Sequence, residues 1–300
     1  MDSRIPDYVR QALTRDCGEA AAEEILAGFP ARRPVTLRLN PLRGDTAETE
    51  GMLRAAGLDM RPADWYADAR ILPGADERDV QALPLYAEGR VYLQSLSAMV
   101  PALLMPLRPG MSVLDMCAAP GGKTTQMAAL AGGQIDLTCC ERDPLRAERL
   151  RHNLQVQGVR RAVVMNTDAR RLDPMFRFDA VLLDAPCTGS GTLLTGEDSP
   201  TRHMEPAWVQ KTVRTQRALL QKAISVLKPG GTLVYATCSI LREENEGAVE
   251  EALRAGQRLV PVPRAVADAL PTLPVTVPGT LCIRPTELYE GFFAAVLTKV

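Results

Sequence analysis

The stretch VLDMCAAPGGKTT, which runs from Val113 to Thr125, decides the fold of this 300-residue chain. It begins with an apolar run that ends at Asp115, passes through a glycine-containing turn and leads into a helical pattern from Lys123 to Leu130. A strand, a glycine turn and a helix in this order form a crevice for a nucleotide-like cofactor at the carboxyl end of the strand. Glycine lets a bulky ligand approach the backbone closely. The stretch therefore predicts the first strand-helix unit of a cofactor-binding sheet.

The end of this stretch, GGKTT, is also similar to the end of a phosphate-binding P-loop. A P-loop requires a glycine five positions before the glycine that precedes its lysine. Counting back from Gly122, that position is Cys117, whose side chain would occupy the phosphate nest. An adenosine-bearing cofactor is therefore favoured over a triphosphate, and a tight turn with no ligand remains an alternative.

The composition is that of an ordinary globular chain, with 46% hydrophobic and 24% charged residues. The N-terminal segment MDSRIPDYVR has an early acid and no apolar run, and nothing in the sequence approaches the length of a membrane span. We therefore expect a cytoplasmic protein that is not bound to membranes. The seven cysteines form no CxxC pair, and the two histidines stand in no ligand-spaced cluster, so we expect reduced thiols and no metal site.

The net charge of -1 does not by itself indicate a nucleic-acid-binding protein. Only five of the 35 basic residues are lysine, however, and arginine makes bidentate phosphate contacts that lysine cannot make. Arginines cluster at 32–33, 142–151, 160–161, 170–171 and 214–217. These clusters fit either an RNA-facing surface or ordinary solvated faces.

The first part of the chain predicts a small α/β module over residues 1–84. VTLRLN (35–40) alternates apolar and polar residues, as a half-buried strand does, and residues 46–57 predict a helix closed by glycine.

From Gly110 onward the pattern alternates between strands and helices. Strands are predicted at 111–116, 134–140, 162–166, 179–184, 231–237 and in the final GFFAAVLTKV, and helices at 123–131, 144–157, 207–227 and 243–255. Near-continuous apolar strands that alternate with helices are typical of a parallel sheet covered on both faces. Residues 85–300 are therefore predicted to form one large α/β domain.

Ligands of such sheets bind beyond the carboxyl ends of the strands, so the residues at these ends are candidates for function. Glu141 follows the second strand and could accept hydrogen bonds from both hydroxyls of a ribose, or could pair with a neighbouring arginine. Asp168 follows the third strand and could accept from an adenine amino group, or could cap a helix.

The next two strand ends carry cysteines. The fourth predicted strand ends in DAPCTGSG (184–191) and the fifth in ATCS (236–239), which brings Cys187 and Cys238 to neighbouring strand ends beside the cofactor crevice. Cysteine is also among the most buried residue types, so a structural role is the alternative. The small polar neighbours of both cysteines favour a functional one.

A thiol and a carboxyl group together suit one methyl acceptor, the C5 carbon of cytosine. This carbon is a poor nucleophile until a thiolate adds to C6, which turns C5 into an enamine carbon. A carboxyl group at N3 absorbs the charge that develops. Splitting the reaction through a covalent intermediate replaces one difficult step by easier ones, and the thiolate is the form of cysteine that reacts.

The chain resembles the RNA cytosine-C5 methyltransferases of the RsmB/RsmF and NSUN type over nearly its whole length. The motifs that carry the resemblance are LRLNPLR (37–43), GRVYLQSLSAMVPA (89–102), LDMCAAPGGKTTQMA (114–128), ERDPLRAERLRHNLQVQG (141–158), FDAVLLDAPCTGSGTL (178–193), LKPGGTLVYATCSILREENE (227–246) and EGFFAAVL (290–297). The resemblance implies a Rossmann-like, class I S-adenosylmethionine-dependent methyltransferase sheet over residues 85–300. The small α/β module at residues 1–84 would be RNA-binding-like.

The resemblance also implies roles for single residues. The S-adenosyl-L-methionine site would be lined by Cys117, Ala118, Ala119, Pro120, Gly121, Gly122 and Lys123, with Glu141 on the ribose and Asp168 near the adenine. Cys238 would be the nucleophile and Cys187 would assist release of the methylated base. Asp184 would touch the cofactor side of the pocket and hydrogen-bond the target cytosine. DNA cytosine-C5 enzymes carry the nucleophile in a PCQ-type motif on the fourth strand, so the TCS motif favours the RNA type.

The implied function is methylation of cytosine C5 in RNA, with 16S-type small-subunit rRNA as substrate, by a monomer that also meets the assembling small ribosomal subunit. Methylation of tRNA, an RNA-binding assembly factor with little catalysis, and an ATP-dependent enzyme that uses GGKTT are the alternatives. The segment TGEDSPTRHMEPAW (195–208), with Arg202 and His203, looks longer than its family counterpart and is expected to reshape the RNA entrance.

Overall fold

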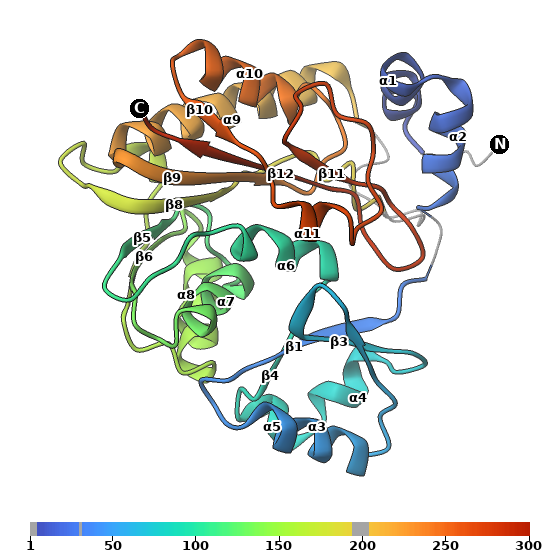
Figure 1. Ribbon diagram of the computed structural model, residues 1–300, viewed down its shortest axis with the longest axis vertical. Coiled ribbons are helices and arrows are strands. Elements are labelled where there is room, and N and C mark those ends of the chain that lie inside the picture. The colour runs from blue at the N-terminus through green and yellow to red at the C-terminus, as the bar shows by residue number, and fades with distance from the viewer. Residues whose placement is uncertain (1–4, 30–31, 194–203) are drawn as a thin grey trace. The chain divides into compact units, whose positions relative to one another are not determined.

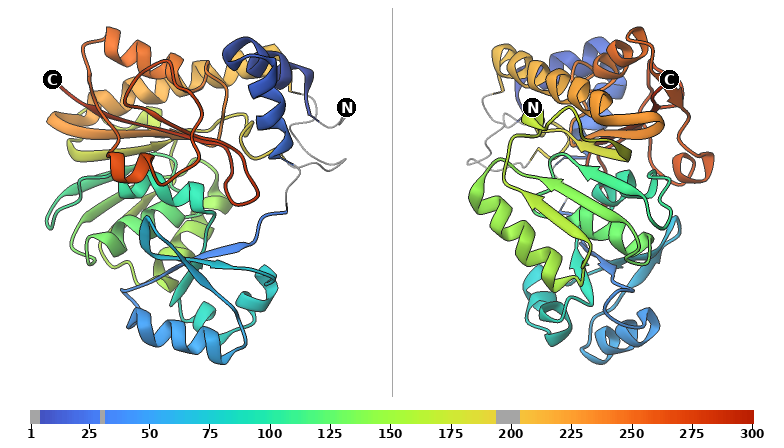
Figure 2. Two further views of the ribbon diagram at one scale, coloured as in Figure 1. Left: turned by 45° about the vertical axis from the view of Figure 1, so that its right-hand side comes forward. Right: turned by 90° about the vertical axis from the view of Figure 1, so that its left-hand side faces the viewer.

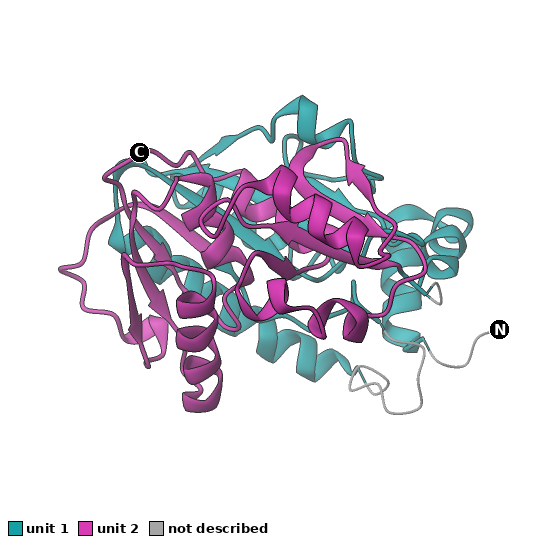
Figure 3. Cartoon of the chain, turned by 90° about the horizontal axis from the view of Figure 1, so that it is seen from below, with its two compact units in different colours: residues 1–33, 183–300 teal, residues 34–182 magenta. Residues whose placement is uncertain are grey.

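The computed structural model describes residues 5–29, 32–193 and 204–300 (Figure 1). The described residues group into two compact units, unit 1 with residues 1–33 and 183–300 and unit 2 with residues 34–182 (Figure 3). The division falls inside strand β8 (Phe178–Asp184), whose last two residues belong to unit 1.

Unit 2 starts with a small antiparallel sheet in the strand order β2-β3-β1-β4. Its strands are β1 (Val35–Leu39), β2 (Arg61–Ala63), β3 (Tyr66–Leu72) and β4 (Val91–Leu93), and the helices beside it are α3 (Thr46–Ala55), α4 (Glu77–Gln81) and α5 (Pro84–Ala87). Leu37 and Leu39 of β1 pack in one core with Leu53 of α3, Val80 of α4 and Leu85 of α5. The core of this sheet is thus built from its own helices.

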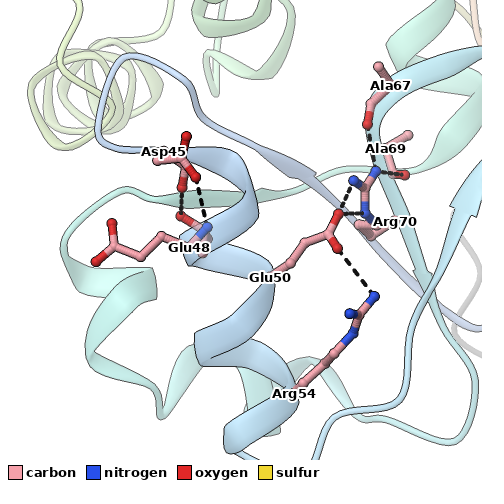
Figure 4. A network of polar contacts seen from close by, with 8 residues as sticks. Asp45, Glu48, Glu50, Arg54, Ala67, Ala69 and Arg70 are labelled. Atoms are coloured by element: carbon pink, nitrogen blue, oxygen red, sulfur yellow. Dashed lines mark hydrogen bonds and ion pairs between the residues drawn. The ribbon is translucent and has the colours of Figure 1, made fainter.

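Helix α3 is also fixed to this sheet by polar contacts (Figure 4). Asp45 caps the helix by accepting a hydrogen bond of 2.8 Å from the backbone N–H of Glu48. Glu50 lies between two arginines: it accepts from Nε of Arg70 on β3 at 2.6 Å and pairs with Arg54 one turn further along the helix at 3.2 Å. The Glu50 and Arg70 side chains are mostly buried, which makes their ion pair less screened than a surface pair.

The face of the small sheet that carries Arg38 and Asn40 is buried, which the sequence did not predict. The alternation in VTLRLN predicts that Arg38 faces solvent, but Arg38 and Asn40 are both buried. The guanidinium of Arg38 donates to Oγ1 of Thr125 at 2.9 Å, and the amide of Asn40 donates to the backbone oxygen of Gln157 at 2.9 Å. The prediction was wrong because other parts of unit 2 cover this face. Burial lowers the pKa of Arg38.

The rest of unit 2 is the predicted parallel sheet. Strand β5 (Ser112–Asp115) pairs in parallel with β6 (Asp136–Cys140) and β8, and β6 pairs in parallel with β7 (Ala162–Met165). Helix α7 (Gly122–Leu130) packs on β6 and on α6 (Leu96–Leu103), and α8 (Pro144–Val156) packs on β7. Because these strands are parallel, their carboxyl ends lie at one edge. The predicted α/β class is confirmed.

Unit 1 contains the last strands. Strand β12 (Phe292–Thr298) is antiparallel to β9 (Leu227–Thr237), β10 (Arg258–Val260) and β11 (Leu281–Ile283). Helices α9 (Pro206–Val226) and α10 (Glu246–Arg254) lie side by side next to β9 (Figures 1 and 2). The remaining helices are α1 (Asp7–Cys17), α2 (Glu19–Ala27) and α11 (Arg264–Ala267). The expectation of a purely parallel sheet is thus corrected for the final strand, since apolar residues reveal burial but not direction.

Two predictions about chain organisation stay open. The division into a module at 1–84 and a domain at 85–300 remains a proposal; β4 at Val91–Leu93 completes the small sheet, whereas α1 and α2 group with unit 1. The segment predicted to be long, 195–208, lies outside the described residues up to 203, together with Arg202 and His203. No helix within the described ranges is long and apolar enough to cross a membrane.

Candidate active site

The turn after β5 is anchored to the strands on both sides of it. The backbone N–H of Met116 donates to Leu182 of β8, and that of Ala118 donates to Cys140 of β6, both at 3.0 Å. The buried carboxylate of Asp115 accepts a 2.6 Å hydrogen bond from Oγ1 of Thr124, which joins the end of the strand to the first turn of α7. The start of the turn is therefore held in one conformation before any ligand binds.

The same contacts disfavour the P-loop alternative. In a P-loop the hydroxyl after the lysine faces Mg²⁺. Here the hydroxyl of Thr124, which follows Lys123, is buried and donates to Asp115. Thr125 is buried as well and donates to the backbone oxygen of Gly122 at 3.0 Å. Both hydroxyls are committed to holding the turn.

Helix α8 holds the other side of the turn. The guanidinium of Arg146 donates to the backbone oxygen of Ala119 at 2.8 Å, and the amide of Asn153 donates to that of Pro120 at 2.7 Å. Gly121, the residue before α7, has a φ of 113°. A side chain is strained in this region of backbone space, so glycine is required here. Cys117, Gly122 and Lys123 are partly exposed.

We expect Gly121→Ala to lower the stability of the protein by about 1–3 kcal/mol and to weaken cofactor binding. A Cβ at this position would lie 3.0 Å from Cδ1 of Leu150, in addition to the strain at positive φ. Thermal unfolding and titration calorimetry with S-adenosylmethionine measure the two effects. The matched control is Gly51→Ala in α3, where a Cβ meets no atom within 4 Å. Equal stability and affinity in the two variants would contradict the requirement for glycine.

Glu141 and Asp168, predicted to hold the ribose and the adenine, each have a partner of their own. One oxygen of the buried Glu141 accepts from the backbone N–H of Asp143 at 2.9 Å, and the other lies 3.4 Å from a guanidinium nitrogen of Arg146. A carboxylate has about four acceptor positions, so capacity for ribose hydroxyls remains. Asp168 caps the 3-10 turn Ala169–Arg171 and pairs with Arg170, whose side chain lowers the pKa of Asp168. Their cofactor contacts stay predictions.

The predicted thiols come together in unit 1. The chain after β8 continues along β9, where the N–H of Ala185 donates to the oxygen of Ala236 at 2.8 Å. The N–H of Gly191 donates to the oxygen of Cys238 at 3.0 Å. The Sγ atoms of Cys187 and Cys238 lie 3.1 Å apart, and both side chains are partly exposed. Asp184, at the end of β8, is partly exposed as well.

The neighbouring sulfur changes the acidity of Cys187. The hydrogen bond with Cys238 is the largest cause that raises the pKa of the Cys187 thiol, and burial is the next. Two thiolates at this separation would repel each other strongly, so the first proton lost from the pair leaves the second one harder to remove. The raised pKa keeps the proton on Cys187.

The buried carboxylate of Glu244 was not predicted from the sequence. It accepts hydrogen bonds from Thr188 and Ser239, the residues that directly follow the two cysteines. Its segment, LREENE (241–246), was part of the resemblance but carried no role. The three glutamates of this segment have the same chemistry, and two of them, Glu244 and Glu246, are buried, so the sequence does not distinguish the one that bonds to Thr188 and Ser239. The short distance in sequence between the TCS motif and these acids was the feature that could have indicated a role near Cys238.

The sequence model of the family described as 16S rRNA methyltransferase RsmB/F matches residues 102–298. The chain belongs to this family. The match includes every predicted site residue, from the turn at Cys117–Lys123 to Cys238.

Relatives named ribosomal RNA small subunit methyltransferase F support the assignment to RsmB/F. The protein of Shewanella oneidensis is 34% identical over 98% of this chain and 63% of its own length. That of Shewanella loihica is 32% identical over 88% of this chain and 56% of its own length. The chain thus spans 56–63% of the length of these two relatives.

Solved structures confirm the class I methyltransferase fold of this RsmB/F member. A methyltransferase homolog protein from Pyrococcus horikoshii has a TM-score of 0.80 and 26% identity, covering 99% of this chain and 100% of the other. NSun6 from Pyrococcus horikoshii with SFG, at 22% identity, shares the fold over 100% of both chains with a TM-score of 0.85.

The cofactor of this RsmB/F chain is S-adenosyl-L-methionine. The residues of unit 2 fit it. The positive φ of Gly121 keeps the turn free of a side chain, and the buried Glu141 at the end of β6 is an acceptor for hydroxyl groups. In the described part of the chain, no cluster of three or more His, Cys, Asp or Glu side chains is arranged to hold a metal.

Proposed function

We propose that this chain methylates C5 of cytosine in RNA, and that its substrate is 16S-type small-subunit rRNA. Membership of the RsmB/F family and the names of its relatives support rRNA as the target. The observation that carries the chemistry is the sulfur pair of Cys187 and Cys238, 3.1 Å apart. A methyltransferase that modifies an amino group has no need of a sulfur nucleophile, whereas C5 chemistry requires one.

In this proposal Cys238 is the nucleophile. Its thiolate adds to C6 of the cytosine, and C5 gains the electron density that it otherwise lacks. Asp184 hydrogen-bonds N3 and absorbs the charge that develops on the ring. S-adenosylmethionine supplies an electrophilic methyl group. Loss of the C5 proton and elimination of the Cys238 sulfur then restore the aromatic base.

Cys187 assists the release of the product. The thiol of Cys187, whose pKa is raised, keeps its proton. When the C6–S bond breaks, the S–H of Cys187 is next to the departing sulfur and stabilises it by a hydrogen bond. In this proposal Cys187 is thus the hydrogen-bond donor and Cys238 is the nucleophile.

The cofactor residues act by holding and orienting. The turn Cys117–Lys123 lines the S-adenosylmethionine site, Glu141 accepts hydrogen bonds from the ribose hydroxyls, and Asp168 accepts one from the adenine amino group. Holding the cofactor in one orientation lowers the activation barrier, because the reaction then starts from a single bound geometry and not from a random encounter of two reactants.

The arginine clusters do not all serve RNA. Arginines of four clusters are paired with acids: Arg151 with Glu148, Arg161 with Asp136, Arg170 with Asp168 and Arg217 with Glu251. Exposed ion pairs of this kind contribute little to the stability of a protein and are typical of solvated surfaces. We propose that RNA is bound by exposed arginines of these clusters and by the small module. We also propose that the assembling small subunit is a partner and that the protein acts as a cytoplasmic monomer.

The test is methyl transfer from S-adenosylmethionine with a tritiated methyl group to deproteinised small-subunit rRNA, to assembled small subunits and to tRNA. We expect label in the rRNA and, after digestion to nucleosides, in 5-methylcytidine. Label in N4-methylcytidine would refute the proposed chemistry, and label confined to tRNA would refute the proposed substrate.

A further inference from the structure

Glu244 is a buried acid of unit 1 on which donors from several segments converge. Its Oε1 accepts from the backbone N–H of Thr188 at 2.9 Å and from the amide of Gln216 at 3.0 Å. Its Oε2 accepts from the hydroxyls of Thr188 and Ser239, both at 2.6 Å. Burial raises the pKa of Glu244, and these hydrogen bonds oppose the effect of burial. Convergent donors of this kind are what an ionised carboxylate requires in a buried site.

The donors stand next to the thiols in the sequence. Thr188 directly follows Cys187, and Ser239 directly follows Cys238. One carboxylate therefore ties together two loops whose cysteines are 51 residues apart in the chain. The distance between the sulfur atoms depends on this bridge, because each cysteine precedes a residue that Glu244 holds.

The serine hydroxyl groups near Glu244 form a chain in which each one donates its proton toward the carboxylate. Ser239 donates its proton to Glu244, so in the 2.7 Å contact between Ser190 and Ser239 the donor is Ser190. Ser190 in turn accepts from the backbone N–H of Ile240 at 3.0 Å. The chain of hydrogen bonds thus ends on the carboxylate, which only accepts. In a Glu244→Gln protein one of these positions would be an NH2 group, which donates, so some of the hydroxyl groups would have to turn.

Glu244 itself is fixed from behind. The hydroxyl of Tyr235 donates to the backbone oxygen of Glu244 at 2.6 Å, and the amide of Asn245 donates to the backbone oxygen of Ser239 at 2.9 Å. The backbone that carries this carboxylate is therefore held in place.

The charge of Glu244 also acts on the thiol of Cys187. It is one of the causes that raise the pKa of Cys187, after Cys238 and burial. Asp184 and Arg217 also act electrostatically on Tyr235, whose hydroxyl donates to the backbone of Glu244.

We propose that Glu244 is a positioning residue: by holding Thr188 and Ser239 it sets the spacing of the sulfurs of Cys187 and Cys238. This role rests on the proposed function, yet its effect on the thiols exists without RNA or cofactor and can be measured separately.

The first measurement is alkylation of the whole protein by iodoacetamide near neutral pH, without RNA or cofactor, with both cysteines quantified by peptide mass spectrometry. We expect faster alkylation of Cys238 than of Cys187 in the wild type, and a fall of about tenfold in this preference in Glu244→Gln. Glu244→Asp, which keeps the charge, should recover part of the preference. The matched control is Glu250→Gln, the same change at a partly exposed acid of α10.

The second measurement is catalysis. Glu244→Gln should lower kcat for methyl transfer by about a hundredfold with little change in KM for RNA, because misplacement of the sulfurs affects the reaction more than binding. A folded Glu244→Gln protein with the wild-type thiol preference would overturn the proposal. If this variant does not fold, Thr188→Val decides, since it removes one hydroxyl donor; an unchanged preference there would overturn the proposal as well. A wild type that methylates no RNA would refute the proposed function, while the alkylation result would still decide the role of Glu244.

Discussion

Cys238→Ser is expected to abolish methyl transfer to RNA, with a loss of about 10⁴-fold or more, and to leave the affinity for S-adenosylmethionine nearly unchanged. A serine hydroxyl is a weak nucleophile at neutral pH unless a base activates it. The neighbouring Cys187 does not supply this base, because its raised pKa keeps it protonated. Apart from Asp184, the residues assigned to the cofactor lie in unit 2, whereas Cys238 lies in unit 1. Tritium transfer to rRNA and calorimetric titration with S-adenosylmethionine measure the two quantities.

The matched control is Cys17→Ser, the same change at a partly exposed cysteine of α1. It should keep full activity. Wild-type activity in Cys238→Ser would exclude the covalent mechanism, and a comparable loss in both variants would point to damage to the fold.

Cys187→Ala is expected to leave the protein covalently attached to methylated RNA. Without the S–H beside Cys238, elimination of the sulfur from C6 slows while its addition continues, so the adduct accumulates. A denaturing gel would show a band of reduced mobility that forms only with both RNA and S-adenosylmethionine and collapses on treatment with ribonuclease. Turnover should fall by about a hundredfold, as for loss of an assisting acid-base group.

The double variant Cys187→Ala/Cys238→Ser is the control for this adduct and should give no band. Absence of the band in a folded Cys187→Ala protein would mean that Cys187 has no part in release. A band that persists in the double variant would mean that a different residue makes the bond to RNA.

Much of the fold could be predicted because its signals are local. The apolar strands from Val113 to Asp184 and the glycine turn at Gly121 follow from short stretches of sequence, and the structure has them within a few residues of the predicted positions. The meeting of Cys187 and Cys238 followed as well, because each stands just after a strand end and the two ends were predicted to be neighbours.

The rest depends on contacts between distant segments. The alternation around Arg38 tells which residues share a face of the strand, but not that the residues around Thr125 cover that face. Glu244 becomes the partner of the thiols only through Thr188, Gln216 and Ser239, which come from three separate segments. Such a convergence has no period and no fixed spacing in the sequence.

The buried contacts of the small sheet limit how the methyltransferase could be re-engineered. Asn40 bonds to Gln157 just after α8, Gln157 bonds back to the backbone of Val91 at 3.0 Å, and Arg43 holds the last carbonyls of α8. Grafting a foreign specificity module onto residue 94 would therefore strip the end of α8 of its partners and remove Arg38 from the first turn of α7. If the module binds RNA as proposed, we expect substrate choice to change by substitutions on the outer surface of the module rather than by exchange of the whole module.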